Sequence, residues 1–345
     1  CMNIYKVTQS EGKGKSLALE EFDHFVALDW SMKSMAIAQV GRRNREPEVF
    51  ERPSSIKALK KYLASLKGRT IITFEETTTA QWLYVELRES VDHVFVCNPR
   101  HNRLLCQGPK TDKIDASKLC LLLRAGLLKE VFHTMNDLYE LRLLVSAYQD
   151  LVQAGVRALN QKKALERGHG DRSKHAAFIL QYLEKSIELY EENKEQYEAK
   201  FEAWCRRNRS LKILLPVAGI GVISAVKIVA VVVDAHRFRK TAHYLSYCGL
   251  VKHEKLSGGR SYGRRKAPYN HTLKGVYKMA ALSAINGKNP IREYYDHLIA
   301  SGVAEHNARH AVARYIARIT FGILKTGTLY EPYRWRSQET KRNVA

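Results

Sequence analysis

The chain has 345 residues, and its 57 Lys and Arg outnumber its 35 Asp and Glu, so the formal net charge is +22. A hydrophobic fraction of 45% excludes a wholly disordered chain, no apolar run reaches the ~18 residues of a membrane span, and a polar start without an apolar signal segment predicts a cytoplasmic protein. The cationic excess favours a polyanion as partner, and nucleic acid is the commonest one.

The first part of the chain predicts alternating strands and helices after a flexible polar leader over residues 1–22. Apolar runs predict five strands, over 22–30, 35–40, 48–51, 70–74 and 91–97. Helical spacing predicts helices over 55–66, over 81–90 and from about Lys110 onward. Three strands followed by helix, strand, helix, strand and helix is the order of a ribonuclease-H-like (RuvC-like) α/β domain, which we assign to residues 23–130.

Residues 131–208 predict long helices. Apolar residues from Leu138 to Val152 follow one helical face, and a second stripe from Leu180 to Phe201 repeats in steps of three and four with one polar position, Lys194. This heptad pattern fits a helical hairpin folded on itself and a coiled coil between two chains equally well.

Residues 209–330 predict a mainly helical domain, and residues 331–345 a polar tail. Within the domain, Pro216-Val-Ala-Gly-Ile-Gly221 has the form of a helix-hairpin-helix. In that motif Gly219 and Gly221 would let amides at a helix N-terminus face a phosphate. A simple turn between two helices explains the segment as well.

Four acids predict a metal site. Asp29 closes the first strand, Glu75 closes the fourth, and Asp112 and Asp115 lie three apart at the start of a helix, so they share a helical face. In a ribonuclease-H-like sheet these strands are neighbours and the helix packs beside them. The four carboxylates are therefore expected to converge on Mg²⁺, or on Mn²⁺ in its place, because hard cations prefer oxygen ligands. Two such ions stabilise both the attacking and the leaving oxygen at a phosphodiester.

Each acid also has a structural explanation. Asp29 is a possible turn former at a strand end, and Asp112 is a possible helix cap. Glu76 competes with Glu75, because adjacent strand residues point to opposite faces and only one of them can serve.

A second candidate centre is Ser257, which precedes Gly258 and Gly259 in a basic segment. Glycines leave a hydroxyl room to approach a phosphate, and arginines stabilise the charge of the transition state, so this serine is a candidate nucleophile for a covalent link to DNA. The cations predicted to contact nucleic acid are Lys252, Lys255, Arg260, Arg264, Arg265 and Lys266. The alternative is a basic surface loop whose serine only caps the backbone.

Several short blocks, in this order and spacing, resemble the DEDD-type insertion-sequence transposases, a family of bridge-RNA-guided recombinases that also includes the pilin-gene invertase. The blocks that carry the resemblance are Ala27-Leu-Asp29 with Lys33, Ile72-Thr-Phe-Glu75, Asn98-Pro99, Lys110-Thr-Asp-Lys-Ile-Asp-Ala116, Pro216-Val-Ala-Gly-Ile-Gly221, Tyr247-Cys-Gly-Leu250 and Ser257-Gly258.

The resemblance implies a RuvC-like domain with Asp29, Glu75, Asp112 and Asp115 as its four acids, and a C-terminal domain with Ser257 as nucleophile. It implies a coiled coil that helps to build a homodimer or homotetramer, and a noncoding guide RNA that pairs with donor and target DNA. Acids and serine from different subunits would then act together in strand exchange.

Two other classes remain open from the residues alone. One is a junction-resolving nuclease that uses water, in which Ser257 has no role. The other is a scaffold that binds nucleic acid and whose acids are structural.

Overall fold

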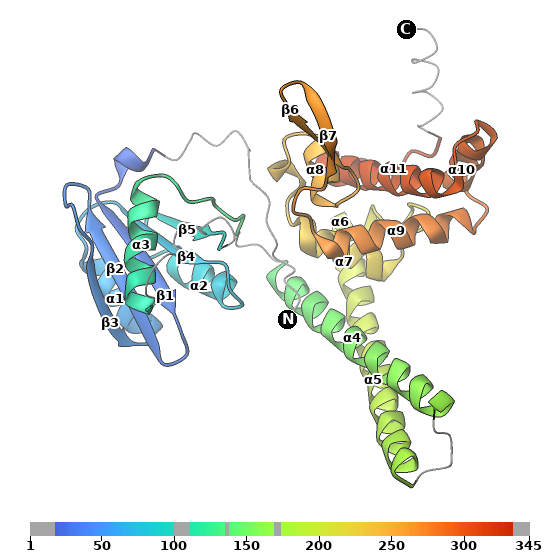
Figure 1. The fold of residues 1–345 in the computed structure, drawn as a ribbon, viewed down its shortest axis with the longest axis horizontal. Coiled ribbons are helices and arrows are strands. Elements are labelled where there is room, and N and C mark those ends of the chain that lie inside the picture. The colour runs from blue at the N-terminus through green and yellow to red at the C-terminus, as the bar shows by residue number, and fades with distance from the viewer. Residues whose placement is uncertain (1–17, 100–110, 135–137, 169–173, 334–345) are drawn as a thin grey trace. The chain divides into compact units, whose positions relative to one another are not determined.

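The computed structural model describes residues 18–99, 111–134, 138–168 and 174–333, and these divide into two compact units between residues 134 and 138 (Figure 1). The predictions for the leader before residue 18, for Lys110 and for the tail after residue 333 lie outside the described residues. None of the helices in the described ranges combines the length and the apolar character that a bilayer crossing requires.

The first unit contains a five-stranded sheet with helices on both faces. After a 3-10 turn at Leu19–Glu21 its elements are β1 (His24–Trp30), β2 (Ser34–Gly41), β3 (Glu48–Pro53), α1 (Ile56–Ser65), β4 (Thr70–Glu75), α2 (Ala80–Leu87), β5 (His93–Cys97) and α3 (Asp112–Arg124). The strand order is β3-β2-β1-β4-β5, with the first three strands antiparallel and β1, β4 and β5 parallel. This mixed sheet is compatible with the predicted ribonuclease-H-like domain.

The two faces of the sheet bury different residues, because successive side chains of a strand point to opposite sides. Phe25, Ala27 and Ile71 pack with the buried residues of α3, whereas Val26 and Ile72 pack with residues of α1 and α2. Figure 1 shows α3 lying across one face of the sheet. The odd-numbered residues of β1 and β4 therefore face α3.

The last residues of the predicted flexible leader are folded against the first unit. Phe22 is 2% exposed and packs edge-on against Phe25, and the Arg69 guanidinium lies over its ring. Burial of this ring holds the preceding turn, Leu19–Glu21, against the sheet.

The second unit is mainly helical, as predicted. Its elements are α4 (Tyr139–Gly168), α5 (Lys174–Arg207), α6 (Arg209–Lys212), α7 (Val222–Val232), a 3-10 turn at Ala235–Arg237, α8 (Thr241–Tyr247), β6 (His253–Ser257), β7 (Arg260–Arg265), α9 (His271–Ile285), α10 (Pro290–Ala300) and α11 (Glu305–Thr326). The helices predicted as a separate segment share one core with α7, α9 and α11.

Helices α4 and α5 form the self-folded helical hairpin, one of the two predicted arrangements (Figure 1). The Tyr190 ring packs where a side chain on Gly155 would stand, and Tyr148 Oη donates a hydrogen bond to Glu198 at 2.8 Å. Lys162 and Glu184 form an ion pair at 2.8 Å farther along the hairpin. The predicted stripe on α5 thus packs within the chain.

Buried polar contacts join α8, α9 and α11. The hydroxyls of Tyr244 and Tyr277 lie 2.5 Å apart, and Tyr277 Oη lies 2.8 Å from Thr320 Oγ1. Burial raises the pKa of both phenols, so both stay neutral and can share these hydrogen bonds. The network fixes the helices that flank the β6–β7 segment.

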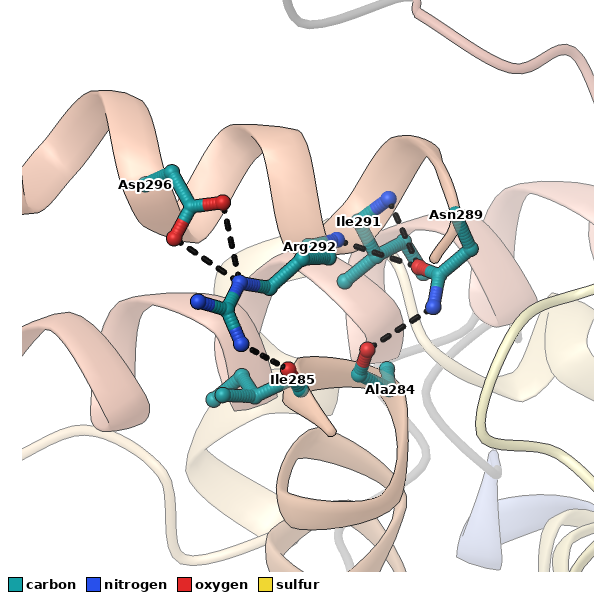
Figure 2. A network of polar contacts seen from close by, with 6 residues as sticks. All are labelled: Ala284, Ile285, Asn289, Ile291, Arg292 and Asp296. Carbon is teal, nitrogen blue, oxygen red and sulfur yellow. Dashed lines mark hydrogen bonds and ion pairs between the residues drawn. The ribbon is translucent and has the colours of Figure 1, made fainter. Parts of the chain in front are cut away.

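A second network sets the corner between α9 and α10 (Figure 2). The Asn289 carboxamide accepts hydrogen bonds from the amides of Ile291 and Arg292 and donates one to the Ala284 carbonyl. Arg292 donates to Asp296 and to the Ile285 carbonyl. Because Asn289 caps the start of α10 and also binds the end of α9, it fixes how the two helices join.

The predicted basic loop is a β-hairpin. Gly258 and Gly259 join β6 to β7 in a two-residue turn with φ of 55° and 77°, a conformation that glycine adopts without strain. All residues of the two strands are exposed. Their side chains are consequently accessible to a large partner.

Candidate functional site

The sheet register aligns two of the predicted acids. β1 and β4 pair in parallel from His24 opposite Thr70 to Ala27 opposite Thr73, and the same offset makes Asp29 level with Glu75. Both residues are half-buried and both belong to the α3 face by alternation. Two carboxylates thus share one face at the carboxyl ends of neighbouring strands.

Helix α3 brings its first turn to the same end of the sheet. Cys120 Sγ donates to the Phe25 carbonyl at 3.2 Å, near the start of β1. Lys113 Nζ lies 3.8 Å from Glu51 of β3. Glu51 pairs with Ala36 of β2, and Ala36 pairs with Asp29 of β1, so these three residues are level across the sheet. The helix therefore runs antiparallel to β1, and its N-terminus lies level with Asp29.

The acids of α3 continue its buried stripe toward that end. Ala116 and Cys120 face the sheet, and Asp112 precedes them by four and eight residues. Asp115 stands four residues before Leu119, which is also buried. Residues spaced by four share a helical face, so both acids are on the side of α3 that covers the sheet.

The structure removes the cap explanation for Asp112 and separates Glu76 from Glu75. Thr111 is the N-cap of α3, since its hydroxyl accepts the Ile114 amide at 3.3 Å, so Asp112 is not needed as a cap. Glu76 is 8% exposed and follows Phe74 on the face of α1 and α2, opposite to Glu75.

The structure brings the four acids to the same end of the sheet, on the face that α3 covers, but their side chains do not converge on a single position. In the described ranges, no group of three or more His, Cys, Asp or Glu side chains is close enough to hold a metal ion. The donor set itself fits a hard cation, because it offers four carboxylates and no softer ligand.

The β6–β7 register sorts the basic residues by face. Ser257 stands opposite Arg260, and Glu254 stands opposite Arg264. The register shifts by one residue between Glu254 and Leu256, so that Arg260 and Arg265, opposite Ser257 and His253, lie on the same face of the hairpin. Together with Lys255 they give Ser257 a basic face. Arg264 lies on the other face and pairs with Glu254 at 3.6 Å, so its charge is partly compensated.

The predicted helix-hairpin-helix glycines have different surroundings. Gly219 has φ of +84°, and a Cβ on it would lie 2.1 Å from the Ala280 carbonyl of α9. Gly221 is the N-cap of α7 and has open space around it. Close packing of two backbones therefore explains Gly219, whereas Gly221 leaves the first amides of α7 accessible.

A groove of about 400 Å³ lies beside this turn, and its lining includes Gly219, Gly221 and Ser224. Glu198 and Glu202 of α5 line it too, and they form ion pairs with Lys194 and Arg206 at 3.8 and 3.7 Å. These carboxylates make the groove less favourable for a phosphate than a turn lined only by amides.

Gly219→Ala is expected to destabilise the fold by at least ~3 kcal/mol, because the left-handed backbone costs ~1–2 kcal/mol and the clash with Ala280 adds to it. Thermal unfolding followed by circular dichroism should show a melting temperature lower by roughly 6 °C or more. Gly221→Ala is the matched control and should change stability by about 1 kcal/mol at most. Equal melting temperatures for the two variants would contradict the packing explanation.

Sequence reasoning missed two residues that the structure brings to Lys266. Tyr269 and Lys274 contact each other near the start of α9, and both lie within reach of Lys266. Asn270 before His271 is a readable helix cap, and it would have placed Lys274 in the first turns of a helix.

Comparison with protein families gives two matches, which together span parts of both units. A model of DEDD transposases of the IS110 type, described as "Transposase", matches residues 26–167 and includes all four acids. A second model, "Transposase IS116/IS110/IS902 family", matches residues 211–296 and includes the two glycines and Ser257.

Three relatives agree with these models. The IS110 uncharacterized 43.6 kDa protein of Streptomyces coelicolor is 28% identical over 185 residues, which is 53% of this chain and 44% of that protein. The probable family 20 transposase of Pseudomonas aeruginosa is 22% identical over 290 residues, 76% of this chain and 86% of that protein. The IS116 uncharacterized 44.8 kDa protein of Streptomyces clavuligerus is 25% identical over 128 residues, 37% of this chain and 32% of that protein. The chain belongs to the IS110 family of DEDD insertion-element transposases.

Proposed function

We propose that the protein is an RNA-guided DNA recombinase of an insertion sequence, which uses a carboxylate metal site and a serine nucleophile to cleave and exchange strands. The observation that carries the proposal is the alignment of Asp29 with Glu75 on the face that α3 covers. Asp112 and Asp115 lie in the first turn of α3 at the same end, which gives four oxygen donors from three elements.

In this proposal Asp29, Glu75, Asp112 and Asp115 hold Mg²⁺, or Mn²⁺ in its place. The bound cation would supply Lewis-acid stabilisation of charge on phosphate oxygens. The half-buried positions of Asp29, Glu75 and Asp115 support this assignment, because partial exclusion of water strengthens the attraction between carboxylate and cation.

Ser257 is the proposed nucleophile. Its Oγ forms a bond to a DNA phosphorus while the bond from that phosphorus to a sugar oxygen breaks, and the serine proton ends on the departing oxygen. Arg260 stands directly opposite on β7, and in this proposal it stabilises the charged phosphoryl oxygens. Reversal of the same step on a new strand completes the exchange.

The proposed partners are donor DNA, target DNA and a noncoding guide RNA. If base pairing to the RNA reads the sequence, the protein needs mainly backbone contacts, and a net charge of +22 suits that task. A cytoplasmic site of action follows from those partners.

A homodimer or homotetramer is part of the proposal. Helix α5 exposes Phe178 (72%), Tyr182 (68%) and Leu189 (60%). Spacings of four and seven residues put these side chains on one side of α5, while the residues that pack within the chain, such as Leu183 and Phe201, are buried. These exposed apolar side chains would pack against a second copy of the same chain.

The test is the covalent intermediate. The full chain, the transcribed noncoding RNA, Mg²⁺ and a duplex from the junction of the element with its flanking DNA are incubated, and denatured samples are examined for DNA that migrates with protein. A denaturant-resistant adduct is expected. Metal-dependent nicking without an adduct would indicate a nuclease that uses water, and binding without breakage would indicate a scaffold; both contradict the proposal.

Binding of DNA or RNA is expected to weaken steeply with salt, because cations that contact phosphates release counterions. For roughly six to ten phosphate contacts, affinity should fall by about 10³ to 10⁵ between ~50 and ~200 mM salt. Fluorescence anisotropy at several salt concentrations measures the slope. A flat plot of log affinity against log salt would show that charge does not dominate binding.

A further inference from the structure

A cluster of cations surrounds one tyrosine at the foot of the β6–β7 hairpin. Lys274 Nζ donates to Tyr269 Oη at 3.1 Å and lies 4.4 Å from the centre of its ring. Lys266 Nζ lies 5.7 Å from the same centre. The amines of Lys266 and Lys274 are within hydrogen-bonding reach of each other. Residues Lys266, Tyr269 and Lys274 are called the lysine–tyrosine cluster below.

The backbone holds this cluster in place. Gly249 has φ of +65°, and a Cβ there would stand 2.6 Å from the Tyr269 ring, so the ring packs directly on that glycine. Asn270 is buried, its amide donates to the Tyr247 carbonyl at 2.7 Å, and its side chain caps α9. Tyr269 is thus fixed between α8 and α9, and Lys274 follows on the next turn of α9.

The positive charge of the cluster is not compensated by acids. In the described part of the chain, none of Lys252, Lys266, Lys274 and Lys278 forms an ion pair. The contact with Lys274 lowers the pKa of Lys266, and the hydrogen bond from Lys274 lowers the pKa of Tyr269. Ammonium groups this close repel each other, and an anion between them would offset the repulsion.

More cations extend the same surface onto α11. Burial lowers the pKa of His310, and the positive charges of Lys278 and Arg314 act in the same direction. Lys266 contributes to that field as well. The cluster therefore belongs to a wider cationic surface, and such a charge distribution suits a nucleic-acid backbone.

We propose that Lys266, Tyr269 and Lys274 bind one backbone phosphate of the DNA on which the hairpin acts, and so set the register of that DNA along β6 and β7. The ammonium groups and the phenol hydroxyl all donate hydrogen bonds to phosphate oxygens. This inference rests on the proposed function, because it takes the hairpin tip with Ser257 as the point of cleavage. The site positions DNA and reads no base.

The length of the hairpin gives the spacing. Arg265 pairs with His253, so the next residue on that side, Lys266, lies level with Lys252. Lys252 stands five residues before Ser257 along the chain. Five strand residues span ~16 Å, which corresponds to about five base pairs along a duplex. The bound phosphate should therefore lie about that far from the cleaved one.

A charge-neutral methylphosphonate, introduced at one position of the junction duplex at a time, tests the site. The unmodified protein should lose affinity about tenfold at one position roughly five base pairs from the mapped cleavage point. In the double variant Lys266→Gln/Lys274→Gln that position should have almost no effect, since its partner charges are gone. Tyr269→Phe, which keeps the ring on Gly249, should reduce the effect in part.

The matched control is Lys288→Gln, which removes an exposed lysine beyond the other end of α9. It should keep the full methylphosphonate effect. Melting temperatures equal to that of the unmodified protein show that the variants are folded. The same scan on the noncoding RNA is the second arm of the experiment.

The outcomes separate the two proposals. An identical methylphosphonate profile in the double variant, with DNA still cleaved, overturns this site and leaves the proposed function standing. A coupled position found in the RNA but not in the DNA overturns the assignment to DNA. Failure of the unmodified protein to bind or cleave DNA at all contradicts the proposed function itself.

Discussion

Asp29→Asn is expected to reduce DNA strand exchange by at least about two orders of magnitude while leaving the fold intact. The substitution keeps the size and the strand position of the side chain, but it removes one of the charges that offset a divalent cation at a phosphodiester. Asp112→Asn should have a similar effect, because its helix begins level with Asp29. Recombination assays with equal amounts of folded protein measure both.

Thermal unfolding adds a readout that does not depend on activity. Mg²⁺ should raise the melting temperature of the unmodified protein, because a ligand that binds the folded state stabilises it, and should raise that of the two variants less.

The adjacent glutamates provide a matched pair. Glu75→Gln should abolish exchange, whereas Glu76→Gln, on the opposite face, should retain it. Full activity of Asp29→Asn would refute the metal site.

The α/β unit was largely predictable because its burial follows simple periods. Strands β1 and β4 are buried on both faces and read as continuous apolar runs, so their ends, and with them Asp29 and Glu75, were visible in the sequence. What the sequence does not contain is the register. Only the pairing of His24 with Thr70 makes the two acids level.

The β6–β7 hairpin was missed because it lacks a burial pattern. Its side chains are exposed on both faces, so neither strand alternates between apolar and polar residues. Gly258-Gly259 was the available signal, since two glycines between short segments are typical of a two-residue hairpin turn. Gly219 shows the converse. A motif glycine was interpreted as a phosphate contact, but its closest neighbour is the backbone of Ala280.

Ser257→Ala is expected to keep DNA and RNA binding and to lose strand cleavage together with the covalent adduct. Binding should persist because the cationic residues of the hairpin remain, and the adduct should vanish because the proposed attacking oxygen is gone. Ser261→Ala is the matched control, since Ser261 stands opposite Leu256 on the other face of the same hairpin. Denaturing gels and anisotropy measure adduct and binding. An adduct that survives in Ser257→Ala would place the nucleophile elsewhere.

Mixed subunits test whether acids and serine cooperate across chains. A hydroxyl is a weak nucleophile without a cation or a base, and the acids lie in one compact unit while Ser257 lies in the other. If the acids of one subunit serve the serine of another, mixing Ser257→Ala with Asp29→Asn should restore part of the activity that each lacks alone. A mixture of Ser257→Ala with Glu75→Gln should restore it as well. A mixture of Asp29→Asn with Glu75→Gln should not, because each chain then lacks one acid and neither can supply a complete set of four. Loss of adduct without recovery in any mixture would leave Ser257 as the nucleophile and refute the shared site.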